Sequence, residues 1–296
     1  MTAEILQNTA DGLALGSSYA LLAIGFTLVF GVLRRVNLAY GASVLVGLYL
    51  AVWAYQTFHV PALLLAPIVV LATVAAGAYV ERLCFAPHVK RAAVTSMAAS
   101  FVVWMQLEES ATLLLPQHTQ AFPSPFEFAP VVVGPVTLPP EHILALICAA
   151  VSALVLWALL YRSRYGLAVR AMIDNRQAAA CVGINVARMS AEIFALASAV
   201  GGITGYLIVT IHGQVTPMFA MWATLKGILA AMLGGLGSFS GAVVGGLLLG
   251  LLESHSQSLF GPQYRELYGY VLLFAMLGLY PAGLSGLWRR PRAGAC

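Results

Sequence analysis

Long apolar runs follow one another along the chain, and short polar segments separate them. A helix needs about 20 mostly apolar residues to cross the hydrocarbon core of a bilayer, and most of the runs approach that length. They cover residues 12–33, 38–55, 61–80, 92–115, 142–161, 191–211, 222–236, 241–253 and 267–284. The pattern predicts an all-α fold, a polytopic transmembrane helical bundle of eight or nine spans that forms a single domain over residues 1–296.

The number of spans depends on the runs at residues 222–236 and 241–253, because each is shorter than a full crossing. Either run could form a tilted or partial helix that lies between other helices. Composition supports the membrane class, since 60% of the residues are hydrophobic and only 9% are charged. A transmembrane β-barrel would instead show weakly alternating segments of about ten residues.

Positive charge predicts the orientation, because Lys and Arg favour cytoplasmic loops. Thirteen of the 15 Lys and Arg residues fall on one side if the N-terminus is periplasmic and the C-terminus cytoplasmic; they cluster at residues 34–35, 82–91, 162–188 and 289–292. Only Lys226 and Arg265 fall on the other side. This orientation requires an odd number of crossings and therefore favours nine.

The same orientation makes residues 116–141 a periplasmic loop, which holds seven of the 14 prolines and no Lys or Arg. Its stretch "FEFAPVVVGPVTLPP" contains two short β-prone pieces around Gly-Pro. We expect either a small hairpin or lid, or a passive connector. The four cysteines, Cys84, Cys148, Cys181 and Cys296, show no CxxC spacing, and we expect free thiols.

Glycines repeat at four-residue spacing in several runs, which lets helix backbones approach closely in lipid. The pairs and triplets are Gly12/Gly16, Gly201/Gly205, Gly237/Gly241/Gly245 and Gly246/Gly250. We interpret them as helix-packing ridges. The alternative for the glycine-rich stretch at residues 233–250 is a flexible hairpin that moves or lines a pathway.

Polar groups inside apolar runs are candidates for a translocation pathway, because such groups are costly in a membrane. Glu108 and Glu109 follow Gln106 in the outer part of the fourth run. They either line a solute or proton pathway, or they reach towards the outer surface or pair with a neighbour. Asn37 begins the second run, where it could cap the helix or contact solute. Lys226 and Glu192 lie near the ends of their runs, and we expect both at the membrane interface.

The segment at residues 162–190 interrupts the apolar pattern with five arginines and predicts a cytoplasmic loop. Asp174-Asn175 offers an N-cap, "RQAAACV" supplies about two helical turns, and Gly183 can provide the left-handed residue after a helix. A short helix with small side chains and flanking arginines suits docking of another protein. The alternative is a solvated connector.

No catalytic or metal-binding motif occurs in the sequence. Neither lysine follows the glycines of a GxxxxGK[ST] phosphate loop, so we expect no ATPase site in this chain. We therefore expect a non-enzymatic chain that binds no cofactor, metal or nucleic acid.

The segment "QAAACVGINV" resembles the EAA---G coupling loop of ABC importer permeases, with Gln177, Ala178, Ala179 and Gly183 at matching positions. The chain also resembles branched-chain amino acid ABC transporter permeases of the Liv type more specifically. The stretches that carry this resemblance, besides the coupling segment, are "GLALGSSYALLAIGFTLVFGVLRRVNLAYG", "LGGLGSFSGAVVGGLLLGLLE" and "YPAGLSG". The resemblance covers nearly the whole chain, in order.

The resemblance implies a permease subunit that moves branched-chain or other hydrophobic amino acids across the bacterial inner membrane by alternating access. Its implied partners are a second related permease, two cytoplasmic ATPase subunits that bind the ATP, a periplasmic solute-binding protein and membrane lipid. The coupling region would comprise Arg170, Asp174, Asn175, Arg176, Gln177, Ala178, Ala179 and Gly183.

Two departures from the family pattern concern candidate pathway residues. The family commonly has His where this chain has Tyr40, just before Gly41, and an Asn where Leu107 follows Gln106. Urea, amides or aromatic acids are therefore alternative cargoes. A proton-coupled secondary transporter that uses Glu108 or Glu109 is a further alternative. A membrane scaffold would leave the coupling segment unexplained.

Overall fold

The computed structural model describes residues 2–88, 92–115, 119–123, 131–133, 136–279 and 283–284. Most of these residues are helical, as the apolar runs predict. The helices are α1 (Thr2–Leu33), α2 (Tyr40–Phe58), α3 (Ala62–Val80), α4 (Ala93–Leu114), α5 (Pro140–Arg162), α6 (Arg164–Asp174), α7 (Arg176–Cys181), α8 (Val186–His212), α9 (Phe219–Gly234), α10 (Phe239–Phe260) and α11 (Arg265–Leu279). A π-helical turn, η1 (Glu81–Phe85), extends α3, and a 3-10 turn, η2 (Pro262–Tyr264), precedes α11.

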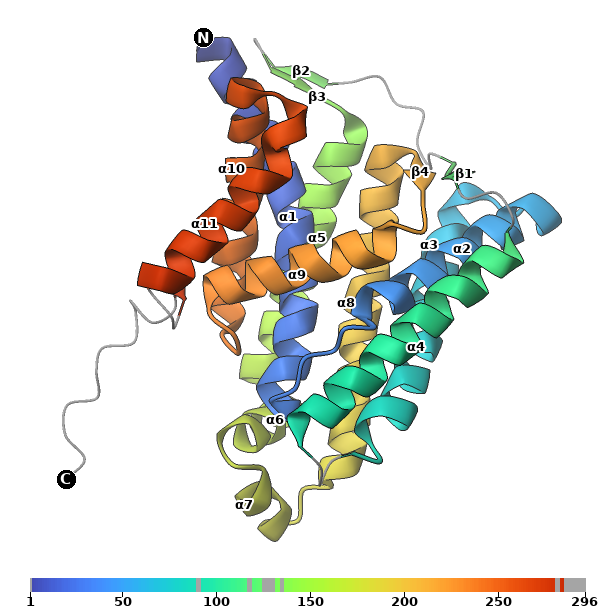
Figure 1. The fold of residues 1–296 in the computed structure, drawn as a ribbon, viewed down its shortest axis with the longest axis vertical. Coiled ribbons are helices and arrows are strands. Elements are labelled where there is room, and N and C mark those ends of the chain that lie inside the picture. The colour runs from blue at the N-terminus through green and yellow to red at the C-terminus, as the bar shows by residue number, and fades with distance from the viewer. Residues whose placement is uncertain are drawn as a thin grey trace.

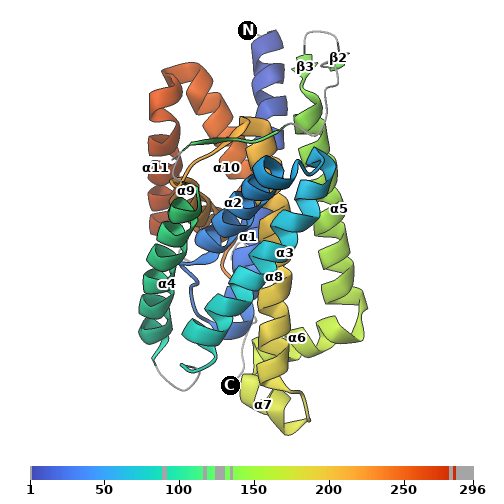
Figure 2. The same ribbon diagram turned by 90° about the vertical axis from the view of Figure 1, so that its right-hand side faces the viewer.

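Long helices run side by side along the longest axis of the molecule, with α1 in their midst (Figures 1 and 2). In the described residues, five helical segments are long and apolar enough to cross a membrane: residues 4–33, 40–58, 64–85, 140–162 and 186–212. Helices α9 and α10 add a sixth if they count as one span bent by 117°. A multi-pass helical bundle is therefore confirmed, and the count of eight or nine stays a prediction.

Two of the predicted runs differ from these five in instructive ways. Helix α4 has the length of a span, but Gln106, Glu108 and Glu109 lower its hydropathy. The last predicted run, residues 267–284, lies partly outside the described residues, and α11 covers its first part. Helix α1 begins ten residues earlier than the apolar run, because polar residues continue the helix beyond the apolar stretch.

Glycines bring α1 and α10 into direct backbone contact. A Cβ atom added at Gly246 would lie 2.3 Å from the Cα of Ala20, and one at Gly250 would lie 2.3 Å from the Cα of Gly16. Gly12 faces the backbone of Leu251 in the same way. The predicted ridges on these two helices therefore pack against each other.

The bend between α9 and α10 also depends on glycine. Gly241 and Gly245 pack against the backbone of Gly234, as predicted for helix-packing residues. Gly237 does not share these contacts, since an added Cβ there would meet no atom of the described residues within 4 Å. Gly237 lies in the turn between the helices with φ of 87°, a left-handed conformation that favours glycine.

The two ends of the molecule differ. Strands β2 (Val131–Val133) and β3 (Val136–Leu138) form an antiparallel hairpin near the start of α1 (Figure 2). Strand β1 (Gln120–Ala121) pairs with β4 (Gln214–Val215) towards the same end (Figure 1). The hairpin interpretation of the Pro-rich loop is confirmed for these strands. Helices α6 and α7 lie at the opposite end (Figure 1).

Candidate functional site

Helix α7 forms where the sequence predicts it, and local hydrogen bonds define both of its ends. The Oδ1 atom of Asn175 accepts hydrogen bonds from the backbone N–H groups of Gln177 and Ala178, each at 3.0 Å. Asp174 ends α6 and does not cap α7.

At the other end of α7, Gly183 has φ of 89°. Its N–H donates to the carbonyl of Ala180, and the N–H of Ile184 donates to the carbonyl of Ala179. This is the Schellman arrangement that closes a helix with a left-handed residue.

The outer surface of α7 is open for contact with another molecule. Gln177, Ala178, Ala180, Cys181 and Val182 are exposed, whereas Ala179 is buried against the rest of the chain. Small side chains on the exposed face let a partner approach the helix backbone closely. The surface is too poor in bulky apolar groups to anchor the segment in lipid.

Two arginines of this region have defined partners. The guanidinium of Arg170 lies over the ring of Tyr161, with 5.3 Å between its carbon and the ring centroid. Arg176 donates from Nη2 to the hydroxyl of Ser190 at 3.2 Å. Partial burial lowers the pKa of Arg176, and the nearby charge of Arg35 lowers it further.

A non-helical segment, residues 34–39, connects α1 to α2 and links several helices. Helix α1 ends at Leu33, and Arg34, the next residue, has a left-handed φ of 53° and donates from Nη2 to the carbonyl of Ile173 in α6. Arg35 donates to the hydroxyl of Ser96, and the N–H of Leu38 donates to the hydroxyl of Ser100. Side chains of α4 thus satisfy polar groups of the segment, as irregular backbone in a membrane protein requires.

Three predicted pathway residues lie in or next to this segment. Asn37 does not cap α2, which begins three residues later; its Oδ1 accepts from the N–H of Ala39 at 3.1 Å, a local turn that competes with helix. The hydroxyl of Tyr40 donates to the carbonyl of Ala197 in α8 at 3.1 Å. The N–H of Gly41 donates to the hydroxyl of Thr224 in α9 at 3.0 Å, and a Cβ at Gly41 would collide with the carbonyl of Ala220.

The other three pathway candidates lie on α4. Gln106 accepts a hydrogen bond from the hydroxyl of Tyr79 at 3.2 Å, and Glu108 accepts one from the indole Nε1 of Trp104 at 2.7 Å. The side chain of Glu109 is exposed. Glu108 is therefore paired with a neighbour on its own helix, one of the interpretations left open by the sequence, and its role in a pathway stays a prediction.

The sequence did not predict a buried ion pair between α9 and α10. Lys226, expected at the membrane interface, is only 2% exposed and pairs with Glu253, which is fully buried. The hydroxyl of Tyr19 in α1 donates to Oε2 of Glu253 at 2.8 Å, and Nζ of Lys226 lies 5.8 Å from the centroid of the Tyr19 ring. An available signal was that both residues are ionisable groups in apolar surroundings.

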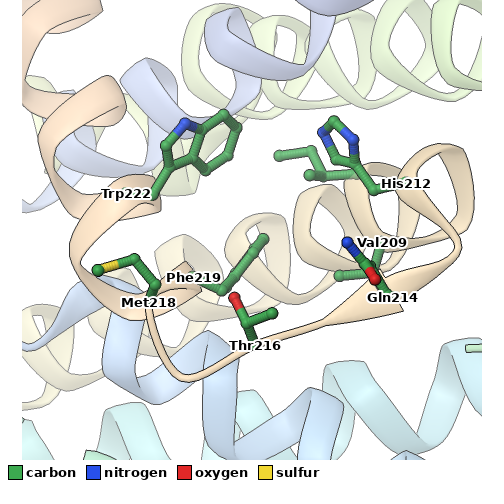
Figure 3. A pocket seen from close by; sticks show the side chains of 8 residues that line it. Val209, His212, Gln214, Thr216, Met218, Phe219 and Trp222 are labelled. Carbon is green, nitrogen blue, oxygen red and sulfur yellow. The ribbon is translucent and has the colours of Figure 1, made fainter. Parts of the chain in front are cut away.

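A cavity of about 210 Å³ lies between the end of α8, β4 and the start of α9, and its lining residue Trp222 contacts Tyr19, the partner of Glu253. Figure 3 shows Trp222 and His212 on one side of it and Thr216 and Gln214 on the other. Ile208, Val209, Met218 and Phe219 give most of the lining an apolar character.

The three described cysteines, Cys84, Cys148 and Cys181, are free thiols, as expected. Within the described residues, no group of three or more His, Cys, Asp or Glu side chains is arranged to hold a metal ion.

These features define a multi-pass α-helical membrane protein with a capped, exposed helix at one end. The sequence model of the branched-chain amino acid transport system permease component matches residues 8–279, and the chain belongs to this family. The match confirms the resemblance found in the sequence.

Curated relatives extend over the same length. The chain is 29% identical to the high-affinity branched-chain amino acid transport permease BraD of Pseudomonas aeruginosa over 293 residues, with 95% of each chain covered. It is 30% identical to the corresponding permease LivH of Escherichia coli K12 over 294 residues, again with 95% of each covered.

A solved structure titled PsaBC from Streptococcus pneumoniae in complex with Fab has a similar fold, with a TM-score of 0.51 over 97% of this chain and 94% of the other at 11% identity.

Proposed function

We propose that this chain is a permease subunit of an ATP-driven importer that moves branched-chain or other hydrophobic amino acids across the inner membrane by alternating access. The observation that carries the proposal is α7, a capped and exposed helix at one end of a family member whose apolar helices can cross a membrane. Such a helix has the form needed to dock into a second protein.

The proposed assembly follows from the family and from the distribution of charge. A second related permease lies beside this chain, two cytoplasmic ATPase subunits bind the ATP, and a periplasmic binding protein delivers the solute. This chain binds no cofactor. The arginine-rich end around α6 and α7 faces the cytoplasm, and the hairpin and the start of α1 face the periplasm. Nine crossings result if α1 to α5 and α8 to α11 are each counted as one crossing.

Movement of α7 by the ATPase would reach the interior through hydrogen-bonded groups. Helix α6 is joined to the end of α1 through Arg34 and Ile173, and residues 34–39 follow directly. In that segment, the N–H of Leu38 donates to Ser100 of α4, and the carbonyl of Leu38 accepts from the hydroxyl of Thr224 of α9 at 3.5 Å. A displacement of α6 therefore changes the position of a segment that contacts two further helices, which suits a two-state transporter.

The test is Gly183→Val in the reconstituted importer. A β-branched residue is strained at φ of 89°, so the end of α7 must change although an added Cβ meets no described atom within 4 Å. We expect uptake to fall by about tenfold or more while ATP hydrolysis by the complex continues.

The matched control is Gly261→Val, which places the same residue at φ of 95° in an equally open position at the other end of the molecule. It should retain uptake. Equal uptake by both variants and the wild type would contradict the coupling role. Loss of wild-type uptake on adding a protonophore at constant ATP would point instead to proton-coupled transport.

A further inference from the structure

The ion pair of Lys226 and Glu253 lies deep within the bundle. Its partner Tyr19 is near the middle of α1, 14 positions before Leu33, which corresponds to about 20 Å of helix. Helix α9, which carries Lys226, crosses the long helices at about half their height (Figure 1). An ionisable group at such a depth is by default a functional candidate.

Packing alone does not require these charges. Removing two ions from water costs several kcal/mol for each, and apolar side chains of similar volume often serve structure at least as well. The glycine contacts already hold α10 against α1 and α9. The ion pair therefore needs an explanation other than the association of these helices.

Aromatic rings connect the ion pair to the cavity of Figure 3. Trp222 lines the cavity and precedes Lys226 by four residues on α9, so both lie on the same helix face. Its ring meets Tyr19 edge-on at 5.7 Å, and Tyr19 donates to Glu253. On its other side, Trp222 faces His212 at 6.4 Å. Trp222 and Tyr19 therefore form a continuous chain of contacts from the cavity lining to Glu253.

We propose that this cavity and the Lys226–Glu253 pair together form a binding site for a zwitterionic amino acid with an apolar side chain. Ile208, Val209 and Phe219 contact the apolar side chain, Lys226 binds the α-carboxylate, and Glu253 binds the α-ammonium group. The inference rests on the proposed transport function and adds the site that selects the solute.

Charge balance favours this class of ligand. When the internal pair opens, each protein charge receives an opposite charge from the zwitterion, so no buried charge is left without a partner. A solute with one charge leaves either Lys226 or Glu253 unpaired, and a neutral solute such as urea leaves both. The site therefore discriminates against monoacids, amines and urea.

The first experiment measures leucine uptake by the complete reconstituted importer with Lys226→Gln, Glu253→Gln and the reversed pair Lys226→Glu/Glu253→Lys. We expect uptake to fall at least about tenfold in all three while binding-protein-stimulated ATP hydrolysis persists. A purely structural ion pair would be restored by reversal, whereas a site that orients a zwitterion against an apolar cavity would not. Restored uptake in the reversed pair overturns the proposal.

A second experiment does not depend on the buried charges. Met218→Trp adds bulk to the cavity lining from a position that is 62% exposed, so the fold should tolerate it. We expect the ratio of leucine to alanine uptake to fall at least about fivefold, and an unchanged ratio counts against the cavity.

A third experiment measures competition in the wild type. Leucinamide and isocaproate, which each lack one charge, should compete at least about tenfold more weakly than leucine. Equal competition also overturns the site.

The proposed function and the proposed binding site are contradicted by different results. A wild-type importer that takes up no amino acid contradicts the proposed function, and the site falls with it. Wild-type amino acid uptake with wild-type behaviour of the Lys226 and Glu253 variants contradicts the site alone.

Discussion

Asn175 shows how one side chain can determine whether a short helix is present. Its two hydrogen bonds to the first turn of the six-residue α7 replace partners that a helix start lacks. We predict that Asn175→Ala weakens α7 by about 1 kcal/mol and lowers the affinity for the ATPase subunits several-fold, measured by co-purification or titration. Asn175→Asp, which retains the capping oxygen, should behave like the wild type.

Asn185 offers a matched control, since it caps α8 through the N–H of Arg188 in the same way. Helix α8 has 27 residues and is held by packing, so Asn185→Ala should leave ATPase binding nearly unchanged. Equal loss in both variants would show that capping in general, rather than α7, determines the affinity.

Some single residues could be predicted from the sequence and others could not. Capping by Asn175 and the left-handed Gly183 follow from local rules, and both were predicted. The pairing of Lys226 with Glu253 joins positions 27 residues apart and depends on the bend between α9 and α10, which no local rule supplies. Asn37 failed as a cap because its side chain bonds to the backbone two residues later, outside the helix.

At the level of elements, the contact of α1 with α10 has almost no room for side chains. We predict that Gly246→Ala forces these helices apart, because its Cβ would lie 2.3 Å from the backbone of Ala20, and costs about 1–3 kcal/mol. The loss should appear as a lower thermal unfolding temperature of the detergent-purified protein.

Gly278→Ala serves as the control, since an added Cβ at Gly278 in α11 meets nothing within 4 Å. In that position alanine should be neutral or slightly stabilising, because it favours helix over glycine. A Gly246→Ala variant as stable as Gly278→Ala would contradict the close approach.

Helix positions were more predictable than helix directions. Apolar runs locate the long helices because the bilayer sets their length. The early start of α1 escaped the pattern, since polar residues can continue a helix outside the apolar region, where Gln7 bonds to the backbone of Thr137 in β3. The bend after α9 depends on Gly235 and Gly237 adopting positive φ. The sequence favoured helix packing for the glycines of residues 233–250 and left a hairpin there as the alternative.

At the scale of the whole molecule, arginines are concentrated at the end formed by α6 and α7, and this difference between the ends allows a test of orientation. Cys181 is an exposed thiol on α7, whereas Cys84 is buried. We predict that, in a Cys296→Ser background, a membrane-impermeant maleimide labels Cys181 in inside-out vesicles and not in right-side-out ones. The reason is that the arginine-rich end should face the cytoplasm.

A cysteine at the opposite end should show the reverse pattern. Thr119 is exposed beside β1, so Thr119→Cys combined with Cys181→Ser and Cys296→Ser places an exposed thiol at the hairpin end. Right-side-out vesicles should label this variant and inside-out vesicles should not. Labelling of Cys181 from the outside would reverse the orientation and leave α7 unable to meet a cytoplasmic ATPase. The coupling role of α7 therefore depends on this result.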